Sequence, residues 1–181
     1  NDGDEDLFVT VLSGSYGYQL INNFILYEME NDFIYQTSNF IESVDMLSDV
    51  NPTFCDIDSD GDADMFVGTD FDPSSVPWNG KVKMFKNIGL DEHGEPIWSL
   101  EDDDLLNDDI GHNLAPFFAD IDFDEDYDLF IGNFNGNVEY YENVGDKNSH
   151  NYLYSENIEN IDLSGYSTPT LIDLDNDGDL D

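Results

Sequence analysis

The chain has 181 residues, of which 43 are acidic and only four are basic, so its formal net charge at pH 7 is −39. This charge disfavours nucleic acids and anionic membranes as partners and makes cations the natural ones. Acid outside an organised motif can equally form a solvated surface, as in a salt-adapted or marine secreted protein.

The composition also limits the structural class. Disordered acidic chains have few aromatic residues, whereas this chain has 13 Phe, 10 Tyr and 2 Trp, so we expect it to fold. No stretch approaches the roughly 18 apolar residues that span a membrane as a helix. Cys55 is the single cysteine, so no intrachain disulfide can form, and its place in an apolar run predicts a buried small hydrophobe rather than a reactive thiol.

One pattern recurs along the chain and divides it into repeats. The first copy, residues 1–50, opens with NDGDEDLFV and lacks its first strand. Later strands are expected at 23–27 and 33–35, where apolar and aromatic residues cluster. Because Asn1 already lies inside the pattern, we expect the chain to be a segment of a longer one.

The second copy, residues 51–114, contains PTFCDIDSDGDADMFVG at 52–68 and GKVKMFKNIG at 80–89. A strand at 54–58 is expected to enter the acidic loop, and a continuous apolar strand at 65–68 to leave it. In the next strand Val82 and Met84 share one face while Lys83 points to the other. A fourth strand is expected at 96–98.

The third copy, residues 115–167, repeats this order with PFFADIDFDEDYDLFIG at 116–132, GNVEYYENVG at 136–145 and a last strand at 151–154. A fourth copy begins at 168–181 with PTLIDLDNDGDLD at 169–181, whose last six residues nearly repeat the first six of the chain. The equivalent aspartates Asp6, Asp64, Asp128 and Asp181 are spaced by 58, 64 and 53 residues. The sequence therefore predicts three whole repeats that start and end within a loop.

Four short strands per repeat and no long amphipathic helix predict an all-β fold of tandem four-stranded β-propeller-type blades. The propeller closes if more blades lie outside these residues, since four to eight are typical, and otherwise the repeats form an open stacked array. Recurring aromatic residues are expected in the core between sheets: Phe8, Phe66 and Phe130, and likewise Tyr27, Phe85 and Tyr141. Trp78 and Trp98 are the candidates for exposed stacking, although core packing is favoured for Trp98.

The acidic loops have the pattern Asp-x-Asp-x-Asp-Gly-x-x-Asp, best seen at 56–64. In a tightly wound loop, positions 1, 3 and 5 and the closing position 9 can offer carboxylates, while position 7 offers its main-chain oxygen. Six or seven oxygen ligands in a flexible set suit Ca²⁺ better than Mg²⁺, and the absence of His and Cys argues against zinc and copper. The candidate calcium ligands are Asp56, Asp58, Asp60, Asp62 and Asp64; Asp120, Asp122, Asp124, Asp126 and Asp128; Asp173, Asp175, Asp177, Asp179 and Asp181; and Asp2, Asp4 and Asp6.

Position 6 of the loop requires a positive φ, which Gly61 provides without strain. Glu125 stands there in the third repeat, so that loop is expected to be weaker, differently wound, or compensated by the extra carboxylate. An EF-hand is excluded because its glutamate at position 12 is replaced by Val67 and Ile131 within expected strands.

The segments 52–68 and 80–89 resemble the FG-GAP / VCBS repeat family, the blades of integrin α-subunit propellers and of many secreted bacterial proteins. The resemblance covers nearly the whole chain. It implies a β-propeller-type blade, calcium in the loop between the first two strands, and an extracellular setting. It places the ligands at 56–64 and 120–128, with partial sets at both ends.

Catalysis is not expected, because His93, His112 and His150 occupy unrelated positions in the repeat and no nucleophile or phosphate-loop motif occurs. The favoured function is a calcium-stabilised structural or adhesive extracellular module that contacts neighbouring repeats or surface proteins. The alternatives are a ligand- or glycan-binding propeller and a subunit of a self-assembling extracellular filament.

Overall fold

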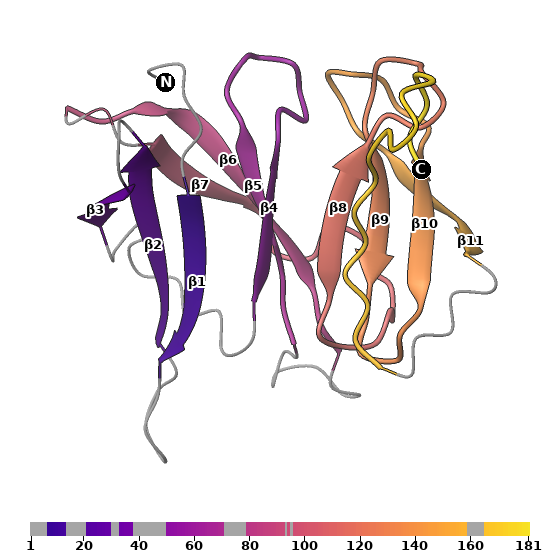
Figure 1. Cartoon of the computed structure of the whole chain (residues 1–181), viewed down its shortest axis with the longest axis horizontal. Helices are drawn as coiled ribbons and strands as arrows, with labels where there is room; N and C mark the ends of the chain where they lie inside the picture. Colours follow the sequence, from indigo (N-terminus) through magenta and orange to yellow (C-terminus); the bar gives the residue numbers. More distant parts are fainter. Residues whose placement is uncertain are drawn as a thin grey trace.

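The computed structural model describes residues 7–13, 21–29, 33–37, 50–70, 79–92, 94, 96–158 and 165–181, with side chains from residue 50 onward apart from 156 and 157. The described residues form β-strands and loops and contain no helix, which confirms the predicted all-β class (Figure 1). Within them, no helix is long and apolar enough to cross a membrane.

Two four-stranded antiparallel sheets follow one another along the chain, in the second and third repeats. The first has strand order β4-β5-β6-β7, and the second runs β8-β9-β10-β11 in the same succession. The strands are β4 (Asn51–Cys55), β5 (Asp64–Gly68), β6 (Val82–Leu90), β7 (Pro96–Asp102), β8 (Ala115–Ala119), β9 (Asp128–Gly132), β10 (Val138–Asn143) and β11 (Tyr152–Asn157). Four short consecutive strands per repeat were predicted, and both repeats have them.

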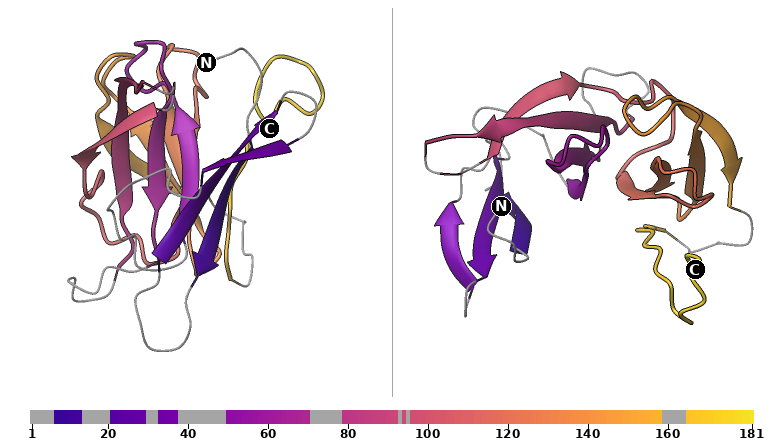
Figure 2. Two further views of the ribbon diagram at one scale, coloured as in Figure 1. Left: turned by 90° about the vertical axis from the view of Figure 1, so that its left-hand side faces the viewer. Right: turned by 90° about the horizontal axis from the view of Figure 1, so that it is seen from above.

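The first repeat contributes an antiparallel sheet of three strands, β1 (Leu7–Ser13), β2 (Ile21–Met29) and β3 (Phe33–Thr37). These contain the strands predicted at 23–27 and 33–35. Seen from above, the three sheets follow a curve rather than a straight line (Figure 2). The described strands form no closed ring.

The strand that enters the acidic loop lies earlier in the sequence than predicted. The expected strand was 54–58, whereas β4 ends at Cys55, with Cys55 opposite Asp64 in the register. The chain leaves the strand at Asp56 because that carboxylate accepts hydrogen bonds from amides four and five residues ahead, which bends the backbone into the loop.

The core lies between the sheets and is built from the strands that were expected to be covered on both faces. All five residues of β5 and of β9 are buried. The Phe66 and Phe118 rings join the two repeats with centroids 4.3 Å apart. The recurring aromatic residues Phe66, Phe85, Phe130 and Tyr141 are buried, as are Val82, Met84 and the predicted Cys55 thiol. The side chains of Phe8, Tyr27 and Trp78 lie outside the described residues, and Trp98 is half-buried against Phe54.

Two glycines at equivalent positions set the close approach of one repeat to the next. A Cβ atom on Gly68 would lie 2.1 Å from the Leu114 oxygen, and one on Gly132 would lie 2.0 Å from the Ser167 oxygen. Because both contacts involve backbone, no side chain could move aside to make room. The backbone contact between the second and third repeats is therefore repeated between the third repeat and residues 165–181.

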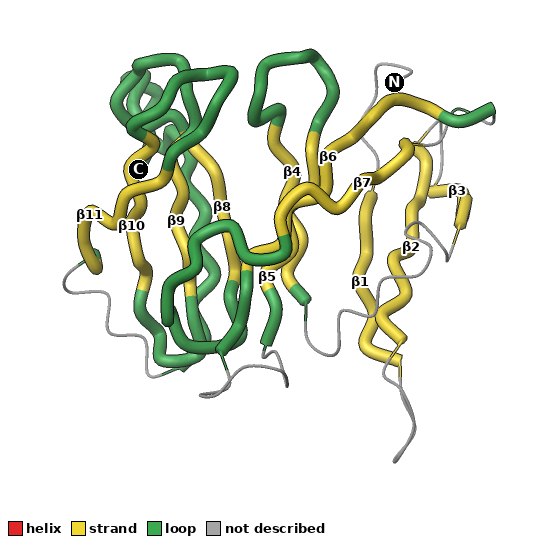
Figure 3. The backbone as a smooth tube through the Cα atoms, turned by 180° about the vertical axis from the view of Figure 1, so that it is seen from behind, coloured by secondary structure: helices red, strands yellow, loops and turns green. Residues whose placement is uncertain are grey.

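The three acidic loops within the described residues lie at one end of the sheets. The β4–β5 loop, the β8–β9 loop and the C-terminal loop gather at the top of Figure 1 and, seen from behind, at the top of Figure 3. The shared blade order and the repeated Gly68 and Gly132 contacts account for this, because each repeat presents its first hairpin in the same direction.

Candidate metal centres in the acidic loops

The loop at 56–64, here called loop 1, is wound by its own first carboxylate. Asp56 accepts hydrogen bonds from the Asp60 amide at 3.0 Å and the Gly61 amide at 3.1 Å, and Asp60 accepts one from the Asp62 amide at 3.0 Å. Ser59 and Gly61 have φ of 56° and 96°, so the positive φ predicted at position 6 is present. The winding therefore follows from short-range contacts within the motif.

The loop at 120–128, loop 2, is wound in the same way although Glu125 replaces the glycine. The Glu125 amide donates to Asp120 at 3.2 Å, as the Gly61 amide does to Asp56, and Glu125 has a φ of 74°. A residue with a Cβ in this region costs about 1–2 kcal/mol. Of the three expected outcomes, a different winding is not found. The Glu125 carboxylate instead faces Lys147, with Nζ 3.2 Å from Oε2.

The loop at 173–181, loop 3, repeats the same pattern once more. Asp173 accepts from the Asp177 amide at 3.2 Å and from the Gly178 amide at 3.1 Å. Asn176 and Gly178 have φ of 64° and 100°. Asp181 accepts from the Leu174 amide at 3.0 Å, which closes the loop.

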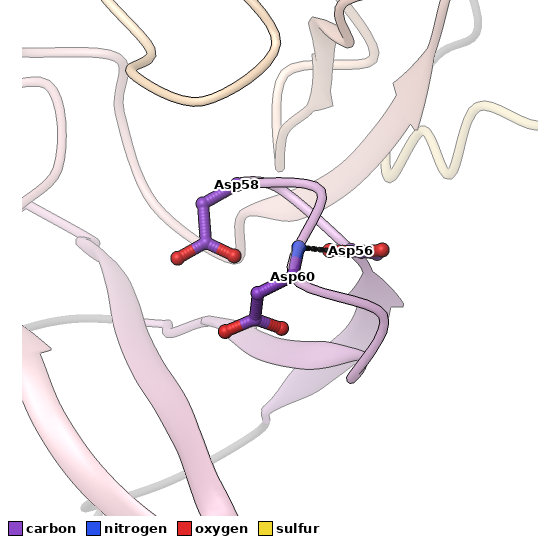
Figure 4. Close-up of side chains that lie close together, drawn as sticks. All are labelled: Asp56, Asp58 and Asp60. Atoms are coloured by element: carbon purple, nitrogen blue, oxygen red, sulfur yellow. Dashed lines mark hydrogen bonds between the residues drawn. The ribbon is translucent and has the colours of Figure 1, made fainter.

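The carboxylates at positions 1, 3 and 5 converge in each loop. One carboxylate oxygen from each of the three residues lies within 4.8 Å of the others, and this holds for all three loops. In loop 1, the Asp58 and Asp60 side chains project to the same side, while Asp56 lies beside the Asp60 nitrogen (Figure 4). The three groups are Asp56, Asp58 and Asp60; Asp120, Asp122 and Asp124; and Asp173, Asp175 and Asp177.

The closing aspartates of loops 1 and 2 are buried and connect the loop to the third strand of the blade. Asp64 has no exposed surface and accepts a hydrogen bond from the Asn87 amide at 2.8 Å. Asp128 is 2 % exposed and accepts one from the Asn143 amide at the same distance. The sheet thus fixes both carboxylates at the end of their loops.

Several buried carboxylate oxygens in these loops have no hydrogen-bond donor. They are Asp58 Oδ1, Asp64 Oδ2, Asp120 Oδ1 and Asp126 Oδ1. A buried anionic oxygen without a partner is costly unless a cation compensates it. Burial raises the pKa of Asp64 to about 6, and burial together with the neighbouring aspartates does the same for Asp126. The donor set therefore fits a hard divalent cation.

The structure places the predicted ligands unequally. Asp62 is exposed at position 7, in keeping with a contribution from its main-chain oxygen, whereas its counterpart Asp126 is buried. Asp2, Asp4 and Asp6 lie outside the described residues.

Three contacts around the loops were not anticipated from the sequence. Lys86 on β6 pairs with Asp58, and Tyr140 on β10 donates to Asp128 Oδ2 at 3.2 Å. The third contact is the hydrogen bond that the backbone amide of Asn87 or Asn143 donates to the closing aspartate of its loop. The only signal for them was the repeated Asn-x-Gly in the two strands, which the sequence alone does not connect to the loop.

Searches against protein-family models, curated proteins and solved structures found no match. The function is therefore argued from the loops themselves.

Acidification is expected to stabilise the metal-free protein. The folded-state pKa values of Asp64 and Asp126 are raised to about 6 from an ordinary value near 3.8, so the folded chain binds protons more tightly than the unfolded chain. This stabilisation is fully present below the unfolded value and is lost as pH rises through about 6. The melting temperature of calcium-stripped protein should rise by several degrees between pH 7.5 and pH 5.

The Asp64→Asn, Asp126→Asn double variant is the control for that measurement. Its melting temperature should rise less on acidification, because the two groups that bind the extra protons are gone. A stripped wild-type protein that melts at a lower temperature at pH 5 than at pH 7.5 would contradict the assignment.

Proposed function

We propose that this chain is a run of calcium-binding blades of the FG-GAP / VCBS type, in which the metal stabilises the fold and takes no part in catalysis. The observation that carries the proposal is the set of buried carboxylate oxygens that lack a donor, two in each of loops 1 and 2, together with the converging aspartates of the same loops. An ion bound among them would replace both the missing hydrogen bonds and the repulsion between carboxylates.

The residues that would hold the ion follow from the winding of the loops. In loop 1 they are the carboxylates of Asp56, Asp58, Asp60 and Asp64 with the main-chain oxygen of Asp62. In loop 2 the Asp126 side chain is also available, because it is buried and its Oδ1 lacks a donor. Calcium is preferred over magnesium because these oxygens come from a loop of adjustable shape rather than a rigid octahedron.

An extracellular structural or adhesive role follows from the affinity expected of such loops. Extracellular calcium modules bind with Kd of about 10⁻⁴ to 10⁻³ M, so they fill outside cells. The repeated glycine contacts at Gly68 and Gly132 support blades that continue in one direction, either around a propeller or along an array. Neighbouring repeats, copies of the chain or other surface proteins would then be its partners.

A calorimetric titration of the chain with calcium tests the proposal. We expect saturable binding of about three ions per chain with Kd in the range of 10⁻⁴ to 10⁻³ M, and much weaker binding of magnesium. If no saturable binding occurs up to about 10 mM calcium, the affinity is well below the range expected of extracellular modules and the proposal is wrong.

A further inference from the structure

Loop 1 already contains a cation that belongs to the protein. The Lys86 ammonium, from β6, pairs with Asp58 Oδ2 and lies 3.5 Å from Asp60 Oδ2. Both aspartates are among the three whose carboxylates converge in this loop. The hydrogen bond from Lys86 holds the pKa of Asp58 below its ordinary value. The ammonium therefore contacts carboxylate oxygens of two of the aspartates that would bind a calcium ion.

The same site contains a second, independent mark of a cation position. Asp64 is completely buried, and its Oδ2 lacks a donor although its Oδ1 is held by the Asn87 amide. Lys86 precedes Asn87 in β6, so the strand that fixes Asp64 also carries the ammonium to the loop. The Lys86 contact leaves Asp64 Oδ2 without a partner, so the ammonium compensates only part of the site.

Loop 2 has no such lysine at the equivalent position. Asn87 and Asn143 play the same part in their blades, which places Glu142 where Lys86 stands. The other three lysines pair with carboxylates outside the expected ligand set: Lys81 and Lys83 with Asp103, and Lys147 with Glu125. Loops 1 and 2 thus differ by two charges at one position on the third strand.

We propose that Lys86 is an internal competitor for calcium in loop 1, which it keeps wound without metal while lowering its affinity for the ion. This inference rests on the proposed calcium function. A divalent ion entering loop 1 must break the Lys86 pairs with Asp58 and Asp60 or sit beside an ammonium that repels it. Loop 2 therefore fills first, even though loop 1 has the unstrained glycine.

The consequence is two classes of calcium site in one chain. Loop 2 would be occupied at lower calcium and would stabilise its blade under most extracellular conditions. Loop 1 would fill only as calcium rises further, and releasing Lys86 would free the ammonium and alter the charge on this face of β6. The chain would then respond to calcium in two steps.

The test compares Lys86→Gln with Lys147→Gln in calcium titrations followed by amide NMR. The Gly61 and Glu125 amides report loops 1 and 2 separately, because each donates to the first aspartate of its own loop. Lys86→Gln should lower the Kd at Gly61 about tenfold and leave the Kd at Glu125 unchanged. Lys147→Gln is the control. It also removes one positive charge, from the exposed lysine that pairs with Glu125, and should leave the Kd at Gly61 unchanged.

Two further readings separate this inference from the calcium proposal. Without metal, Lys86→Gln should melt at a lower temperature than wild type, because loop 1 loses the Lys86 ammonium. If the charge is responsible, Lys86→Met should lower the melting temperature as well. An unchanged or raised Kd at Gly61 in Lys86→Gln, with normal titration at Glu125, overturns the role of Lys86 alone. If neither amide responds to calcium in wild type, the proposed function fails and the inference fails with it.

Discussion

Removing calcium should lower the melting temperature of this chain by roughly 10 °C. An ion that binds only the folded loops contributes RT ln(1 + [L]/Kd), which is about 1.4 kcal/mol for each site at a calcium concentration ten times Kd. Three loops give about 4 kcal/mol, and each kcal/mol moves the melting temperature of a chain of this size by about 2–4 °C. Thermal unfolding followed by circular dichroism, with millimolar calcium or with EDTA, measures the difference.

Screening of the net charge of −39 provides the control for that experiment. High sodium chloride reduces repulsion between exposed carboxylates, since the Debye length falls to about 3 Å at 1 M salt, but it does not supply ligands with a bound ion. We expect 1 M sodium chloride to restore only part of the stability lost in EDTA. Specific calcium binding would be contradicted if 1 M sodium chloride restored all of the stability lost in EDTA. It would also be contradicted if the melting temperature were the same with and without EDTA.

Asp64→Asn should lower the melting temperature in calcium but leave it unchanged or raise it in EDTA. The asparagine carbonyl can still accept the hydrogen bond that Asp64 takes from the Asn87 amide, so the link to β6 is kept. What is lost is the buried charge. In EDTA this relieves the cost of an uncompensated carboxylate, and the variant should melt at or above the temperature of wild type.

In calcium the same substitution removes a ligand and should lower the melting temperature by several degrees. Loop 1 should then bind calcium at least tenfold more weakly, as read by the Gly61 amide. Asp62→Asn is the matched control, since the exposed Asp62 side chain is not an expected ligand. Asp64→Ala, which also loses the bond to Asn87, should cost about 1–3 kcal/mol in both conditions. Equal destabilisation by Asp64→Asn in calcium and in EDTA would make Asp64 a structural acceptor only.

The parts of the structure that the sequence predicts are those that short-range patterns determine. The alternation of aspartates and the glycine at Gly61 predict the wound loop, because the carboxylates bond to amides within five residues. The apolar runs at 65–68 and 129–132 predict strands covered on both faces, and β5 and β9 are fully buried. The blade order follows because consecutive strands pair with their neighbours along the chain.

The parts that the sequence does not predict depend on contacts between distant segments. Lys86 lies on β6, and no short-range pattern in the sequence connects it to Asp58, with which it pairs. Ile57 is buried in loop 1 while its counterpart Ile121 is exposed, so identical patterns pack differently in successive blades. Glu125 adopts the glycine conformation because the Asp120 carboxylate holds its amide, which the residue type alone argues against.

The central claim is that the acidic loops hold a metal ion, and the position of that ion tests it most directly. Terbium is a hard trivalent ion that takes the same oxygen ligands as calcium and scatters X-rays anomalously, so crystals of the chain grown with terbium would reveal each bound ion. We expect anomalous peaks inside loops 1 and 2, next to Asp56, Asp58, Asp60 and Asp64 and next to Asp120, Asp122, Asp124, Asp126 and Asp128. Peaks confined to the outer surface, with none inside either loop at saturating terbium, would contradict the account.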